Sequence, residues 1–156
     1  MTNTLEASIE IDSTPEAVWK VVSDLARMGR WSPQCKKMVI FGGDVTHGTR
    51  TFNINKKGPL VWPTSAKVIR FEPNTAIAWR VVENHTIWTY ELEPTATGTK
   101  VTERREAPTG TTKISALLID KFMGGTADFE VDMIKGMNTT LARIKSEVEA
   151  ATAATR

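Results

Sequence analysis

The sequence predicts an α+β fold in which a curved antiparallel sheet of about seven strands wraps around a long C-terminal helix, with two short helices after the first strand. Three observations predict it. Residues 5–11 alternate between apolar and polar side chains, residues 38–106 hold six further strand-like segments separated by turns, and residues 126–150 carry an apolar stripe at helical spacing. We expect a single domain over residues 1–150, followed by a frayed tail at 151–156.

The first strand and the short helices are read from local patterns. The strand has one apolar face, formed by Leu5, Ala7, Ile9 and Ile11. Thr14 can cap a following helix, Pro15 suits its first turn, and Glu16 favours its positive end. A second short helix is expected over residues 24–30.

Six strand segments follow, and each break between them has turn residues. The segments are Met38–Phe41, Gly48–Asn55, Leu60–Phe71, Ala76–Glu83, Thr86–Glu93 and Thr99–Glu106. Because the connections are short, consecutive strands are expected to pair antiparallel, as a meander.

The last segment is helical. One or two apolar helical turns are expected between residues 114 and 122. A long helix then runs from about Thr126 to Ala150, with apolar residues at intervals of three and four. These residues are Phe129, Met133, Met137, Leu141, Ile144 and Val148. Such a stripe is expected to lie against the sheet.

Composition excludes several classes of function. The chain has 20 basic and 18 acidic residues, which argues against a nucleic-acid partner. Its apolar runs are too short for an integral membrane protein, and without a visible signal peptide we expect a cytoplasmic protein. The two histidines, His47 and His85, lie in separate predicted turns and Cys35 has no ligand partner nearby, so we expect no metal and no cofactor.

Aromatic residues on the predicted strands point to a pocket. Trp62, Trp79, Trp88 and Tyr90 fall on the apolar faces of consecutive strands. If these faces meet the helix stripe, the aromatic rings oppose Phe129, Met133 and Met137. Large rings on a curved sheet would then hold the helix away and leave a cavity, whereas the alternative is a solid core.

Polar residues on two strands bear on chemistry. Glu103 and Arg105 share the phase of Val101, which predicts that they face inward and pair with each other; the alternative is that this strand end emerges into solvent. Asn53 and Asn55 are assigned to an exposed face, which leaves Phe52 and Ile54 with the opposite phase. Cys35 is interpreted as a packing residue.

Several motifs in chain order resemble the START-like superfamily, the polyketide cyclase/dehydrase and lipid transport group. They are Ile9-Glu-Ile-Asp-Ser-Thr-Pro-Glu-Ala-Val-Trp19, Trp31-Ser-Pro33, Gly48-Thr-Arg-Thr-Phe52 with Asn55, Gly58 and Trp62, Trp88-Thr-Tyr-Glu-Leu-Glu-Pro94, Gly98-Thr-Lys-Val-Thr-Glu103 and Gly136-Met-Asn-Thr-Thr-Leu-Ala-Arg-Ile-Lys145. The resemblance implies a helix-grip fold with a deep pocket between sheet and helix. Members bind lipids, sterols, polyketides or plant hormones, and some cyclise or hydrate their ligand.

The favoured hypothesis is non-enzymatic binding or transport of a hydrophobic small molecule, lipid-like or polycyclic. The candidate ligand-binding residues are Trp31, Phe52, Trp62, Trp79, Trp88, Tyr90, Glu103, Arg105, Phe122, Phe129, Met133 and Met137. The alternative is a polyketide aromatase/cyclase or dehydratase, for which Glu103 and Tyr90 are the candidate acid and base groups. A third hypothesis is an interaction module without a ligand. The oligomeric state stays open.

Overall fold

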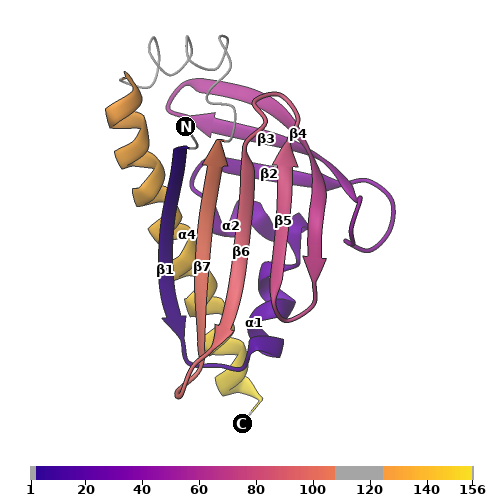
Figure 1. The fold of residues 1–156 in the computed structure, drawn as a ribbon, viewed down its shortest axis with the longest axis vertical. Helices are drawn as coiled ribbons and strands as arrows, with labels where there is room; N and C mark the ends of the chain where they lie inside the picture. The colour runs from indigo at the N-terminus through magenta and orange to yellow at the C-terminus, as the bar shows by residue number, and fades with distance from the viewer. Residues whose placement is uncertain (1–2, 108–124, 156) are drawn as a thin grey trace.

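The structure is a computed structural model that describes residues 3–107 and 125–155 (Figure 1). The strands are β1 (Asn3–Ile11), β2 (Cys35–Ile40), β3 (Arg50–Lys57), β4 (Leu60–Glu72), β5 (Ala76–Val81), β6 (Ile87–Pro94) and β7 (Thr99–Ala107). The helices are α1 (Pro15–Val22), the 3₁₀ turn η1 (Leu25–Arg27), α2 (Met28–Trp31) and α4 (Gly125–Ala154).

The seven strands form one antiparallel sheet in the order β1-β7-β6-β5-β4-β3-β2. The strands from β2 to β7 therefore meander, and the first strand joins the sheet beside the last. The long helix α4 runs along the concave side of the sheet and contacts β1 and β7 (Figure 1). The predicted seven-stranded helix-grip fold is confirmed.

The start of α1 follows the local prediction. The side chain of Thr14 accepts a hydrogen bond from the Ala17 amide at 3.2 Å, and Pro15 occupies the first turn. The apolar side of this helix, formed by Val18, Trp19, Val21 and Val22, is buried. Because α1 contacts both α4 and β6, it closes one end of the space between helix and sheet.

The buried side chains form two clusters. The larger one joins the sheet, the short helices and the C-terminal half of α4 through residues such as Leu25, Val68, Leu141 and Ile144. The smaller one contains Leu5, Phe129, Met133 and Met137, with Leu60, Trp62 and Trp88 packed beside it. The N-terminal half of α4 thus belongs to the smaller cluster.

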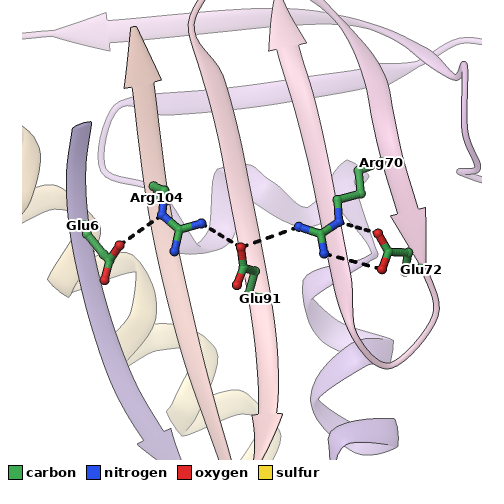
Figure 2. A network of polar contacts seen from close by, with 5 residues as sticks. All are labelled: Glu6, Arg70, Glu72, Glu91 and Arg104. Carbon is green, nitrogen blue, oxygen red and sulfur yellow. Dashed lines mark hydrogen bonds and ion pairs between the residues drawn. The ribbon is translucent and has the colours of Figure 1, made fainter. Parts of the chain in front are cut away.

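The convex face of the sheet carries a chain of ion pairs (Figure 2). Arg104 on β7 contacts Glu6 on β1 at 3.0 Å and Glu91 on β6 at 2.6 Å. Arg70 on β4 reaches the same Glu91 at 3.5 Å and also pairs with Glu72. The intervening strand β5 presents only alanines, Ala76 and Ala78, at these registers. Because these side chains are small, Arg70 on β4 can extend across β5 and reach Glu91 on β6.

The C-terminal end of α4 is longer and better anchored than predicted. The helix continues to Ala154, four residues beyond the end predicted at Ala150. Ser13 and Thr152 share a hydrogen bond of 2.6 Å, and Glu149 accepts one from the Asp12 amide at 2.9 Å. These contacts to the loop after β1 order the last turns. The helical turns predicted between residues 114 and 122 lie outside the described residues.

Candidate ligand-binding site

A pocket of about 1120 Å³ lies between the concave face of the sheet and the N-terminal half of α4. Its walls come from α2 and the loop after it, from strands β2 to β7, and from α4. This volume lies slightly above the range for small-molecule sites, which is roughly 300–1,000 Å³.

The apolar wall consists of aromatic rings and methionines. The rings of Trp62, Trp79, Trp88 and Tyr90 project from β4, β5 and β6 toward Phe129, Met133 and Met137 on α4. Trp79 and Tyr90 stack with their ring centroids 5.8 Å apart. The two independent periodicities, of two on the strands and of three to four on the helix, therefore place these side chains around one space.

Glu103 is a carboxyl group buried in this wall, with 3% of its surface exposed. The Tyr90 hydroxyl donates a hydrogen bond of 2.6 Å to its Oε1 atom, because β6 and β7 pair these two residues directly. Its other oxygen, Oε2, has no hydrogen-bond partner. Burial raises the pKa of Glu103 from its ordinary 4.5 to about 8, although the Tyr90 hydrogen bond acts in the opposite direction. Burial likewise raises the pKa of Tyr90 well above its usual value.

Arg105 lies two residues further along the same face of β7 and is also buried. Its guanidinium carbon lies 5.4 Å from the centre of the Phe129 ring, a cation–π contact. Burial lowers its pKa, and the negative charge of Glu130 partly offsets this. Glu103 and Arg105 both face inward as predicted. They do not form the ion pair that the sequence suggested. Glu103 is bound through Oε1 to Tyr90 and its Oε2 has no partner, while the guanidinium of Arg105 lies over the Phe129 ring.

A polar strip on β3 and β4 crosses the pocket wall. Thr51 donates to Asn53 at 2.9 Å, and Asn53 and Asn55 both donate to Thr64, at 3.2 and 3.0 Å. Asn53 is 3% exposed and Asn55 is also buried. The assignment of these asparagines to an exposed face was therefore wrong. A run of polar residues at spacing two on one strand, opposite a threonine on the next, was the available signal.

Three candidate residues lie elsewhere. Phe52 is 39% exposed on the convex face, since the phase of β3 is the reverse of the one assumed. Trp31 is buried in the larger cluster, where its indole N–H donates to Glu147 at 3.2 Å, and it does not line the pocket. Phe122 falls outside the described residues. The remaining nine candidates line the pocket: Trp62, Trp79, Trp88, Tyr90, Glu103, Arg105, Phe129, Met133 and Met137.

Other chemistry-bearing groups are sparse. Burial raises the pKa of the Cys35 thiol to about 11, which disfavours a reactive thiolate. Across residues 3–107 and 125–155, no cluster of three or more His, Cys, Asp or Glu side chains could hold a metal ion. In the same ranges, no helix is long and apolar enough to cross a membrane.

Solved structures resemble this fold over almost its whole length. A polyketide cyclase-like protein, Cgl2372 from Corynebacterium glutamicum, is 30% identical, with 97% of this chain and 94% of that one covered and a TM-score of 0.64. The ZhuI aromatase/cyclase from Streptomyces sp. R1128 is 14% identical, with 96% and 94% covered and a TM-score of 0.76. The di-domain aromatase/cyclase StfQ of the steffimycin biosynthetic pathway is 13% identical, with 98% of this chain and 52% of that one covered and a TM-score of 0.77.

Sequence comparison gives the family. No curated protein matches the sequence. The family described as polyketide cyclase/dehydrase and lipid transport matches residues 2–149, which is nearly the whole chain. This match is consistent with the helix-grip architecture and with the pocket between the sheet and α4. The chain therefore belongs to the polyketide cyclase/dehydrase and lipid transport family.

Proposed function

We propose that this protein binds an apolar small molecule in the pocket between the sheet and α4. The observation that carries the proposal is a space of about 1120 Å³ whose aromatic and methionine wall includes Trp62, Trp88 and Met133. Burying apolar surface there stabilises a complex by about 25 cal/mol per Å². The thioether of Met133 and its neighbour Met137 can adjust to the shape of an occupant.

The uncharged fluorescent probe N-phenyl-1-naphthylamine tests this proposal. Its emission should rise on binding, and tryptophan emission should change because Trp62, Trp79 and Trp88 line the pocket. Met133→Trp should narrow the pocket and weaken probe binding about tenfold, a loss of roughly 1.4 kcal/mol, while the melting temperature stays close to that of the wild type.

The matched control is Val131→Trp, because Val131 lies on the same helix but is exposed and outside the pocket wall. It should leave probe binding unchanged. A Met133→Trp variant that instead loses stability by about 1–3 kcal/mol would indicate an overpacked solid core and would contradict the proposal. So would an absence of binding by the wild type across fatty acids, sterols and polycyclic phenols.

A second candidate function is that of a polyketide aromatase/cyclase or dehydratase, supported by the Tyr90–Glu103 pair. A carboxyl group with a pKa of about 8 keeps its proton at neutral pH and is suited to general acid catalysis. In dehydration of a β-hydroxyketone, the Glu103 proton would leave with the hydroxyl group as water. The resulting carboxylate would then take the proton from the carbon beside the ketone, as the C=C bond forms.

The enzymatic alternative is tested with 4-hydroxy-4-phenylbutan-2-one, whose dehydration product is a conjugated enone that absorbs in the near ultraviolet. The wild type should form the enone faster than buffer does, and Glu103→Gln should reduce that rate to background. Equal rates for the wild type, the variant and buffer would contradict dehydration of this substrate class. Probe binding without turnover would leave the binding function standing.

A further inference from the structure

The free oxygen of Glu103 is an unsatisfied polar atom in an otherwise well-paired interior. Within residues 3–107 and 125–155 it is the one buried side-chain nitrogen or oxygen without a hydrogen-bond partner. Leaving such an atom unpaired is unfavourable, because it loses its hydrogen bonds to water on burial, and native proteins contain few of them. Since Glu103 borders the pocket, an occupant of the pocket can supply the missing partner.

The surroundings of Glu103 fix which of its oxygens is available. Tyr90 on β6 occupies Oε1, and the residue opposite on β1 is Ala7, which offers no side-chain hydrogen bond. The strand spacing places Arg105 roughly 7 Å along β7, on the same face. Oε2 therefore remains as the hydrogen-bonding atom of this carboxyl group that can meet a ligand.

The hydrogen bond from Tyr90 also determines whether Oε2 of Glu103 donates or accepts a hydrogen bond to a ligand. Because the Tyr90 hydroxyl donates to Oε1, that oxygen acts as the acceptor. In the protonated carboxyl group the acid proton then belongs on Oε2, which becomes a donor. The raised pKa of Glu103 supports this protonated form at neutral pH.

The charges near the pocket disfavour a cationic ligand. Arg105, Lys56 and Lys57 all contribute to its wall. Of the acidic wall residues, Asp132 pairs with Lys57 at 2.8 Å, and Glu83 accepts hydrogen bonds from Ser65. A protonated amine near Glu103 would therefore meet the positive charge of Arg105, while the carboxyl group of Glu103 is itself uncharged at neutral pH.

We propose that Glu103 is the recognition residue for a carbonyl oxygen, so that the ligand is an uncharged apolar ring compound bearing a ketone or quinone oxygen that accepts a hydrogen bond from Oε2. This inference rests on the proposed binding function and adds the chemical class of the ligand. Tyr90 acts as a positioning residue, because it holds the carboxyl group through the other oxygen.

The test uses three ring compounds of nearly the same shape as competitors of N-phenyl-1-naphthylamine. They are 9-fluorenone, which has a ketone oxygen, fluorene, which has none, and 9-aminofluorene, which carries an amine. At about pH 6.5 the carboxyl group of Glu103 stays protonated. Because fluorenone gains a hydrogen bond from Glu103 Oε2, it should displace the probe at a concentration about tenfold lower than fluorene does. 9-Aminofluorene should be the weakest competitor.

Two variants of Glu103 locate the effect. Glu103→Gln keeps an oxygen for Tyr90 and places an N–H donor where Oε2 stands, so the preference for fluorenone should persist. Glu103→Leu has no donor and should bind fluorenone and fluorene equally. Circular dichroism checks that both variants fold. If Glu103→Leu does not fold, the preference of the wild type for fluorenone over fluorene still tests carbonyl recognition.

The outcomes separate the inference from the function on which it rests. If the wild type binds the probe but fluorenone competes no better than fluorene, carbonyl recognition is wrong and apolar binding stands. If Glu103→Leu folds and keeps the full preference for fluorenone, another residue supplies the donor and the assignment to Glu103 is overturned. If the wild type binds no probe or competitor at all, the proposed function itself fails.

Discussion

At the scale of single residues, the protonation of Glu103 links the pocket to pH. Its pKa rises from 4.5 to about 8 on folding because burial disfavours the charged carboxylate. Tyr90 on β6 is hydrogen-bonded to it, Arg105 lies two residues further along the same face of β7, and Cys35 on β2 acts electrostatically on Tyr90. Between these two pH values the folded protein keeps a proton that the unfolded chain releases. Stability contributed at this site is therefore greatest below about pH 4.5 and decreases as the pH rises toward 8.

Glu103→Gln should remove this dependence on pH. The free energy of unfolding of the variant, relative to that of the wild type, should increase from pH 5 to pH 8 by at most about 1.4 kcal/mol per pH unit. Urea unfolding at several pH values measures the difference. Glu93→Gln, on the exposed end of β6, is the control and should show no such trend. A Glu103→Gln profile parallel to that of the wild type would mean that the carboxyl group is not buried in its neutral form.

The side of the sheet on which a residue lies was predicted correctly where apolar and polar side chains alternate strictly along a strand. It was predicted wrongly where buried polar side chains form hydrogen bonds with one another. The phases of Trp79, Tyr90 and Glu103 follow from apolar neighbours two positions away. Asn53 was misplaced because the sequence does not show that Thr64 pairs with it across the strands. Phe52 was misplaced in turn, since its phase was assigned from the asparagines.

At the scale of elements, α4 divides into two halves with different supports. Its C-terminal half is buried in the larger cluster through Leu141, Ile144 and Val148. Polar contacts reinforce this half, including the bond from the Lys145 ammonium to the Glu10 carbonyl at 2.8 Å. The N-terminal half borders the pocket, and the Lys57–Asp132 ion pair and the Arg105–Phe129 cation–π contact join it to the sheet.

Amide hydrogen exchange should follow this division. Without ligand, amides over residues 129–137 should exchange faster than those over residues 141–148, because fewer packed groups must separate to open the N-terminal half. A bound apolar probe should slow exchange over 129–137 and leave 141–148 nearly unchanged. Peptide-resolved mass spectrometry measures both, and the exposed turn at residues 95–97 provides an internal reference. Equal exchange rates along the helix would contradict the division.

The length of α4 illustrates what its pattern could and could not predict. The apolar stripe from Phe129 to Val148 predicted both the helix and the side of it that is buried. The residues after it, rich in alanine and threonine, carry no apolar stripe and were expected to fray. Their order depends on Ser13 and Asp12, which are distant in sequence and contact Thr152 and Glu149. Long-range contacts of this kind have no local signature.

At the scale of the whole molecule, the order of the elements predicted the architecture. Short turns between β2 and β7 require antiparallel neighbours, and an apolar helix at the end needs a sheet face to cover it. The pairing of β1 with β7 closes this arrangement and brings the first strand beside α4. The pocket could be located from these patterns, but its volume depends on how far the rings hold α4 from the sheet.

The ion-pair chain on the convex face connects four of the seven strands. Arg104 and Arg70 join β1, β7, β6 and β4 through shared contacts with Glu91, across the alanines of β5. Individual exposed pairs contribute about 0.2–1 kcal/mol, and a shared network holds several strands in one register. The face opposite the pocket is thereby braced by groups that a ligand never touches.

The two separate clusters of buried side chains have a consequence for how this protein can change over evolutionary time. The larger cluster supplies most of the packing, whereas Phe129, Met133 and Met137 in the smaller one face the pocket. Substitutions among those three residues can therefore alter the shape of the space while the strands and the rest of α4 keep their contacts. A lineage could exchange one ligand for another through a few such replacements, each tolerated on its own, without first having to acquire a more stable fold.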